Sequence, residues 1–132
     1  MKFLTLSVAV IFLAACGTRG SDDEQVRALI KAVEVAAEDR DASDVLVHVG
    51  AQYTDERGDK AQLQNTLRGY FLAYPRIELL VDIESLEFPV PELAQAVIDI
   101  TSLPAGHHAK LEVEFRKSDG KWLAVRADRA RD

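Results

Sequence analysis

One acid and two tyrosines are the residues of this chain whose types and spacing suit acid–base chemistry. Asp55 stands two residues after Tyr53, and Tyr70 follows on an expected helix. A carboxylate in an apolar pocket can remove a proton beside a carbonyl group, because burial raises its pKa toward neutrality. The reaction also needs hydrogen-bond donors directed at the developing oxyanion, which the two tyrosine hydroxyls could supply.

A structural interpretation of the same residues stays open. Asp55 can instead pair with Arg57 or Arg68, or cap the helix that follows it. Tyrosines at these spacings are commonly core residues whose hydroxyl reaches water. Sequence alone therefore gives Asp55, Tyr53 and Tyr70 as candidate catalytic residues without deciding between the two interpretations.

Other kinds of site are disfavoured by the sequence. His107 and His108 are adjacent, so on a strand they would point to opposite faces, and a metal needs convergent ligands. Zinc-site spacings, a phosphate-binding glycine-rich loop and a Gly-x-Ser-x-Gly turn are all missing from the sequence. A formal net charge of −6 at pH 7 disfavours nucleic acid as a partner. We expect no metal and no other cofactor.

The single cysteine, Cys16, closes an apolar N-terminal segment. One basic residue, Lys2, precedes an uncharged run over 3–13, which is typical of a secretory signal. A lone cysteine in an exported chain cannot close an internal disulfide. The other interpretations of Cys16 are an ordinary signal-peptide residue or a buried free thiol.

The run Leu13-Ala14-Ala15-Cys16 resembles the lipobox of bacterial lipoproteins. The resemblance implies cleavage before Cys16 and a diacylglycerol group on its thiol, which would bind the protein to a membrane. Gly17, where an aspartate would imply inner-membrane retention, implies the outer membrane, with the protein facing the periplasm. We predict a signal peptide over 1–15, a lipidated tether over 16–20 and a folded domain over 21–132.

Three helices are expected in the first part of the domain. Ser21 and Glu24 have the spacing of a capping box, and an apolar stripe then predicts a helix to about Arg40. Asp41 or Ser43 would cap a short second helix ending near Gly50, and 51–55 is expected to be extended. Asp59 would cap a third helix, which Tyr74-Pro75 ends because the residue before proline avoids helical dihedrals.

After Pro75 the apolar pattern changes to that of strands. The parity of the first strand changes between Ile83 and Leu86, which indicates a bulge. Ser118-Asp119-Gly120-Lys121 predicts a tight turn before the last strand. Short connections between long strands predict an antiparallel meander. The expected strands cover 77–88, 94–100, 110–116 and 122–127.

Helices followed by antiparallel strands are typical of an α+β domain with the helices on one face of the sheet. This element order, with Tyr53-Thr54-Asp55-Glu56-Arg57-Gly58 and the closing Asp119-Gly120-Lys121-Trp122, resembles the nuclear transport factor 2-like (NTF2-like), cystatin-like superfamily. That superfamily includes ketosteroid isomerase and scytalone dehydratase. The resemblance implies a cone-shaped, curved antiparallel sheet around a pocket, with about three N-terminal helices packed on its concave face.

Ala51, Asp55 and Gly58 resemble the segment that carries the general base of ketosteroid isomerase. The tyrosine donor of that enzyme falls near Val33, and the expected first helix has no tyrosine. The strand over 111–116, where the resemblance implies a second donor, directs its acids outward.

We therefore expect a non-catalytic binding or interaction module. Its expected partners are a second copy of the chain, another envelope protein or a small apolar ligand. The alternative is a small isomerase or dehydratase that acts on an apolar carbonyl compound, with Asp55 as general base.

Overall fold

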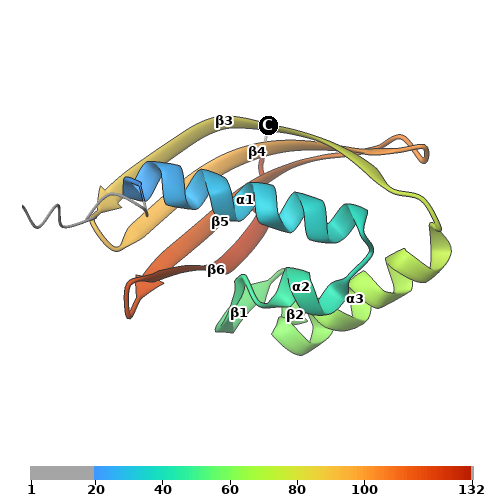
Figure 1. The fold of residues 1–132 in the computed structure, drawn as a ribbon, viewed down its shortest axis with the longest axis horizontal. Coiled ribbons are helices and arrows are strands. Elements are labelled where there is room, and N and C mark those ends of the chain that lie inside the picture. Colours follow the sequence, from blue (N-terminus) through green and yellow to red (C-terminus); the bar gives the residue numbers. More distant parts are fainter. Residues whose placement is uncertain (1–19, 132) are drawn as a thin grey trace, which may run out of the picture.

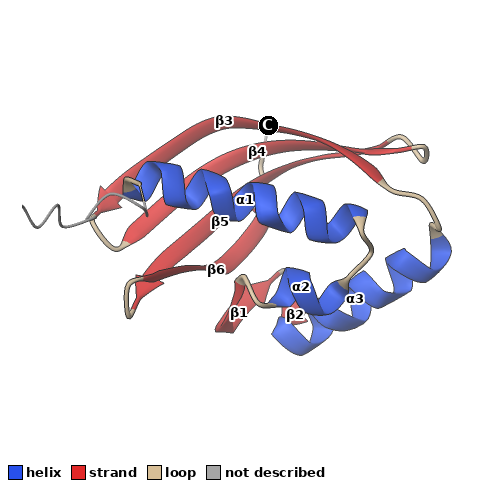
Figure 2. Cartoon of the chain, viewed as in Figure 1, coloured by secondary structure: helices blue, strands red, loops and turns tan. Residues whose placement is uncertain are grey.

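Helices cover one face of a curved, six-stranded sheet in the computed structural model, which describes residues 20–131 (Figures 1 and 2). The α+β class and the expected order of helices and strands are confirmed. The helices are α1 (Asp22–Glu38), α2 (Ala42–Leu46) and α3 (Lys60–Ala73). The strands are β1 (Val49–Asp55), β2 (Gly58–Asp59), β3 (Glu78–Val90), β4 (Leu93–Leu103), β5 (His107–Ser118) and β6 (Lys121–Arg129).

The strands lie in the order β2-β1-β6-β5-β4-β3. The meander from β3 to β6 is antiparallel, as expected. β1 departs from the expectation of an antiparallel sheet, because it pairs with β6 in parallel. This pairing places β6, the last strand along the chain, between β1 and β5.

Side-chain caps determine where the helices begin. Ser21 accepts the N–H of Glu24 at the start of α1, which confirms the cap. Asp41, rather than Ser43, caps α2, and Asp59 caps α3 as expected by accepting the N–H of Gln62. α3 ends at Ala73, and Tyr74, the next residue, has an extended backbone before Pro75. α1 and α2 are slightly shorter than expected, ending at Glu38 and Leu46.

Two irregularities shape the sheet at the expected places. The pairing of β3 with β4 shifts register between Ile83 and Ser85, which is the bulge predicted from the change of parity. The β5–β6 turn has Asp119 and Gly120 at φ 52° and 74°. Positive φ at both central residues gives the two-residue turn whose twist matches antiparallel strands.

Both ends of α1 are tied to the sheet. At its start, Asp22 Oδ1 accepts hydrogen bonds from Lys117 Nζ at 2.9 Å and Trp122 Nε1 at 3.1 Å. These bonds, that from Lys117 first, hold the pKa of Asp22 below its usual range. At its end, Glu38 Oε2 accepts the N–H of Leu79 on β3 at 3.1 Å. The helix is thus fixed along the concave face (Figure 1).

Residues 20–131 contain hydrophobic cores of their own. The largest core lies between α1 and the middle strands and includes Val26, Ile98, Phe115 and Trp122, each at most 4% exposed. A second core joins α1, α2 and α3 around Phe71. We therefore expect this part of the chain to fold independently. Within it, no helix is long and apolar enough to cross a membrane.

Candidate functional site: an apolar cavity between the helices and the sheet

A cavity of about 230 Å³ lies between the helices and the concave face of the sheet. Its wall is aliphatic and aromatic because alternate residues of each strand point toward the helices. α1 contributes one stripe of its surface, and α3 contributes two leucines. The lining residues are Leu29, Ile30, Val33, Glu34, Val45, Val49, Tyr53, Leu63, Leu67, Leu79, Val81, Ile98, Ile100, Leu111, Val113, Phe115, Ala124 and Ala127.

Two of these lining residues, Tyr53 and Glu34, carry a polar side-chain group. Tyr53 on β1 is 5% exposed, and its hydroxyl donates to Asp55 Oδ2 at 2.8 Å. Glu34 on α1 has a side chain that is 15% exposed and forms an ion pair with Lys31 at 3.3 Å. Both polar groups are therefore already engaged, and the surface of the cavity is almost wholly apolar.

Asp55 lies at the end of β1 and is bound by its own turn. Its Oδ1 accepts the backbone N–H groups of Arg57 at 2.7 Å and Gly58 at 3.1 Å. Its Oδ2 accepts the hydroxyl of Tyr53. Asp55 is not among the residues that line the cavity. Both of its oxygens therefore already accept hydrogen bonds, an arrangement typical of a carboxylate that closes a turn.

The pKa of Tyr53 is raised above its ordinary value, first by burial and then by the carboxylate of Asp55. Ionising Tyr53 would place a second negative charge beside Asp55, which is why this carboxylate raises the pKa of Tyr53. The Tyr53 hydroxyl thus stays protonated at neutral pH and directed at the carboxylate.

Tyr70 belongs to a different cluster from Tyr53 and Asp55. Its hydroxyl lies 2.7 Å from Ser102 Oγ and 3.3 Å from His107 Nδ1. Its ring stacks at a tilt on Tyr74, and His107 lies edge-on to Tyr74. The three candidate residues are therefore not brought together: Tyr53 contacts Asp55, and Tyr70 does not line the cavity.

The positions at which the resemblance implied oxyanion donors hold apolar side chains. Val33 lines the cavity from α1, and Leu111, Val113 and Phe115 line it from β5. A developing oxyanion needs preorganised donors about 3 Å away. Among the described residues that line the cavity, no side-chain donor is free to take that role, because the Tyr53 hydroxyl donates to Asp55.

The histidines and the acids do not form a metal site in the described residues, where no group of three metal-binding side chains converges. His107 contacts Tyr70 on the inner side, whereas His108 contacts Asp99. The pKa of His48 is lowered, first by burial and then by Lys121. Cys16 lies outside the described residues.

Glu34 is the residue of this cavity that the sequence analysis missed. It lies four residues after Ile30 and next to Val33, both of which line the cavity, so its position is at the edge of the apolar stripe of α1. Helical spacing could have shown this. The pattern could not show that a cavity would be left beside it.

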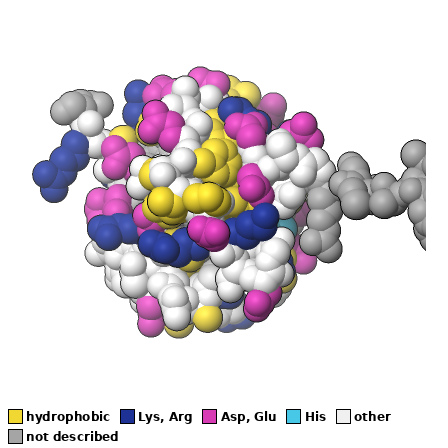
Figure 3. All heavy atoms as spheres, turned by 90° about the vertical axis from the view of Figure 1, so that its left-hand side faces the viewer, with side chains coloured by type: hydrophobic (Ala, Val, Ile, Leu, Met, Phe, Trp, Pro, Cys, Tyr) yellow, Lys and Arg dark blue, Asp and Glu magenta, His cyan; other side chains and the backbone are white. Residues whose placement is uncertain are grey.

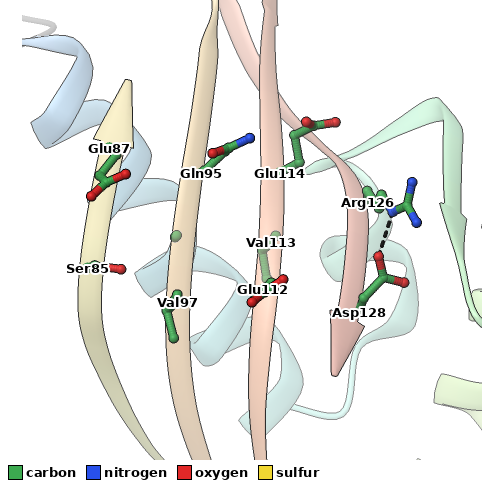
Figure 4. A pocket seen from close by; sticks show the side chains of 10 residues that line it. Ser85, Glu87, Gln95, Val97, Glu112, Val113, Glu114, Arg126 and Asp128 are labelled. Atoms are coloured by element: carbon green, nitrogen blue, oxygen red, sulfur yellow. Dashed lines mark hydrogen bonds and ion pairs between the residues drawn. The ribbon is translucent and has the colours of Figure 1, made fainter. Parts of the chain in front are cut away.

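The opposite face of the sheet carries a polar hollow of about 600 Å³. Figure 4 shows its side chains on β3 to β6, where Arg126 bonds to Asp128. Glu112 lies directly opposite Asp128 in the register of β5 with β6, and Glu114 lies opposite Arg126. The hollow is lined by Ser85, Glu87, Gln95, Ala96, Val97, Glu112, Val113, Glu114, Arg126 and Asp128.

A third surface lies at the end of the molecule where α1 starts, together with the β3–β4 and β5–β6 turns. Figure 3 shows hydrophobic side chains gathered in the middle of this end, with Lys and Arg side chains in a band beneath them. Val90, at the end of β3, is 51% exposed.

Comparison with known proteins identifies the fold and leaves the activity undetermined. No family model matches the sequence, and no curated protein matches it. A domain of unknown function with a cystatin-like fold from Nostoc punctiforme PCC 73102 superimposes with a TM-score of 0.70 at 13% identity, over 84% of this chain and 77% of that one. An NTF2-like protein of unknown function from Pseudomonas putida KT2440 gives 0.68 at 14% identity, over 83% and 85%.

A third similar structure is described as a putative calcium/calmodulin-dependent protein kinase type II association domain, from Thiobacillus denitrificans ATCC 25259. Its TM-score is 0.67 at 15% identity, over 80% of this chain and 94% of that one. Identities this low carry the fold and not the activity. The fold of this chain is therefore the NTF2-like, cystatin-like fold that the sequence predicted.

Proposed function

We propose that this protein is a lipid-anchored envelope protein whose domain binds a small apolar molecule without transforming it. The observation that carries the proposal is the cavity of about 230 Å³ with a nearly continuous aliphatic and aromatic wall. Apolar cavities of about 150 Å³ stay free of water and bind benzene, so a larger cavity of this kind suits a larger hydrocarbon. Benzene has six non-hydrogen atoms, so at the same volume per atom this cavity would hold about nine.

The arrangement of Asp55 supports binding without a chemical step. A general base must reach the proton that it removes. Asp55 accepts three hydrogen bonds from its own turn and strand and does not line the cavity. The alternative, an isomerase or dehydratase with Asp55 as base, stays a prediction that this geometry supports less.

The membrane anchor is the second part of the proposal and rests on Leu13-Ala14-Ala15-Cys16. A tether over 16–20 spans at most about 18 Å. The end of the molecule that carries the start of α1 would then lie near the membrane, and this is the end with the apolar surface of Figure 3. We propose the inner leaflet of the outer membrane as the location.

The anchor is tested by Cys16→Ala in the full-length protein, expressed in a Gram-negative host. The expected result is an unprocessed precursor that no longer carries lipid, whereas a Ser21→Ala control is processed normally. Normal cleavage and membrane retention of Cys16→Ala would overturn the anchor.

Ligand binding is tested by native mass spectrometry of residues 20–132, purified gently from the periplasm. The expected result is an added mass, below about 200 Da by the volume argument, that leaves when the protein is denatured. A clean unliganded mass would favour the interaction module instead, and the oligomeric state in the same spectrum would show whether its partner is a second copy.

A further inference from the structure

The turn between β3 and β4 exposes apolar side chains at the end of the molecule where α1 starts. Resting on the proposed lipid anchor, we infer that this turn, Pro89-Val90-Pro91, inserts into the lipid surface that carries the anchor. The domain then stands end-on, with its long axis directed away from the membrane (Figure 1).

The first step is that the tether and the turn lie at the same end of the domain. Asp22, the first residue of α1, accepts a hydrogen bond from Lys117 Nζ at 2.9 Å. The backbone N–H of the same Lys117 donates to the carbonyl oxygen of Glu92, in the β3–β4 turn, at 2.9 Å. One residue of β5 thus joins the start of α1 to this turn. Because the tether over 16–20 spans at most about 18 Å, a lipid on Cys16 holds this end near the bilayer.

The second step is the chemistry of the turn. Pro89, Val90 and Pro91 are all exposed, Val90 to 51%. Neither proline has a backbone N–H, so moving the turn out of water leaves few donors without a partner. Behind the turn, the ring of Phe88 lies edge-on to the buried Trp122, with 5.7 Å between the ring centroids. The core therefore supports the turn, and Figure 3 shows the apolar side chains that gather at this end.

The third step is the charge around the turn, which determines the kind of lipid surface. Arg116 and Lys121 are exposed at this end, but so are Glu87, Glu92 and Asp119. Attraction to anionic lipid needs an excess of basic side chains, and this end does not have one. The expected partner is therefore a zwitterionic lipid surface, and burial of apolar side chains drives the contact.

The tether makes so small a contact sufficient. One valine and two prolines bury little apolar area, so the turn alone would bind lipid weakly. A short linker turns binding into an intramolecular step, with an effective concentration in the millimolar range. The turn would thus determine the orientation of the domain, while the lipid provides the attachment.

The test supplies the anchor chemically. Residues 16–132 contain one cysteine, Cys16, whose thiol is coupled to a maleimide-bearing lipid in phosphatidylcholine vesicles. Val90→Trp reports insertion, because phosphatidylcholine brominated on its acyl chains quenches a tryptophan that enters the bilayer. The fluorescence of the wild-type chain, from the buried Trp122, is subtracted. We expect the added fluorescence to fall at least twofold, and equally so in about 1 M salt.

Three matched variants assign the quenching to the apolar turn. Leu72→Trp places the same reporter at an 87% exposed site near the end of α3, at the other end of the molecule, and should not be quenched (Figure 1). Pro91→Asp, added to Val90→Trp, puts a charge into the turn and should abolish the quenching. Asn65→Asp adds the same charge at an exposed site on α3 and should leave the quenching unchanged. Circular dichroism first checks that each variant is folded.

Failure of this inference and failure of the proposed anchor are distinguishable. The inference is wrong if Val90→Trp is not quenched, if Leu72→Trp is quenched as strongly, or if Pro91→Asp retains the quenching. Loss of the quenching in high salt would also overturn it, because charge would then drive the contact. If the quenching is as expected but Cys16→Ala is processed and retained normally in cells, the anchor is wrong and the affinity of the turn for lipid stands.

Discussion

The inner and outer faces of the sheet are built from alternate residues of the same strands, yet they differ in almost every physical respect. On β5, Leu111 and Phe115 face the cavity, while Glu112 and Glu114 line the outer hollow. The inner face leaves a space that water does not favour. The outer face gathers carboxylates around Arg126, and one cross-strand pair, Glu112 with Asp128, has like charges. One strand pattern therefore produces a surface suited to apolar ligands and another that resists apolar contact.

The difference also bears on the expectation of a homodimer. An isologous dimer through the outer face would bring the same carboxylates of two copies together. Like-charge contacts disfavour such a pairing, and salt screens them. The homodimer stays a prediction, and a dimer through this face should form more readily at high than at low ionic strength.

The largest expected contrast between the two faces is in stability. Phe115→Ala should reduce the free energy of unfolding by about 3–5 kcal/mol, because Phe115 is 2% exposed in the main core. The neighbouring outward change, Glu114→Ala, should alter it by less than about 0.5 kcal/mol. Urea denaturation measures both. Comparable losses of free energy from the two substitutions would show that the two faces contribute equally to stability.

A smaller contrast concerns ligand affinity. Ala127→Leu adds volume to the cavity wall and should weaken octanol binding at least tenfold, or by about 1.4 kcal/mol. Val97→Leu adds volume on the outer hollow and should leave octanol affinity unchanged. Calorimetric titration of both variants provides the check. Unimpaired binding to Ala127→Leu would place the ligand elsewhere.

Tyr53→Phe tests whether the hydrogen bond from Tyr53 to Asp55 contributes to stability without contributing to ligand binding. Loss of the hydrogen bond to Asp55 should lower the free energy of unfolding by about 1 kcal/mol at pH 7, with octanol affinity retained. The raised pKa of Tyr53 stabilises the fold fully below pH 10 and progressively less as pH rises above it, because the unfolded chain then loses the proton first. The difference in Tm between the wild-type protein and Tyr53→Phe should therefore become smaller above pH 10 in thermal denaturation. A difference in Tm that does not change with pH would contradict the stabilising effect of the raised pKa of Tyr53.

The smallest expected effect is on the outer face. Glu112→Lys replaces a like-charge pair with an ion pair opposite Asp128 and should raise the free energy of unfolding by a few tenths of a kcal/mol. Differential scanning calorimetry at low salt should detect a small rise in Tm that disappears in about 1 M salt. A destabilised variant would mean that Glu112 has a favourable partner in the hollow.

Local features of the fold were predictable because they depend on residues close in sequence. The caps at Ser21 and Asp59, the end of α3 at Pro75 and the bulge after Ile83 all follow from local dihedral and packing preferences. The parallel pairing of β1 with β6 did not, since nothing in residues 49–55 indicates a partner more than seventy positions away.

The candidate site was predictable in part. Tyr53 and Asp55 lie two residues apart on one strand, so their contact could have been inferred from the period of the strand. Whether Asp55 faces the cavity depends on how its turn closes on the backbone of Arg57 and Gly58. Glu34 escaped notice because a cavity is the volume that packing leaves unfilled, and a pattern of residue types does not specify it.

The position of β6 inside the sheet has a consequence for how the protein is made. β6 supplies the neighbour of both β1 and β5, so the two parts of the sheet are joined only after residue 129 has been synthesised. Until then, β1 has only the short β2 as a partner, and the growing chain cannot reach its final topology. In this chain the order of the strands therefore delays completion of the sheet until the last strand has been made.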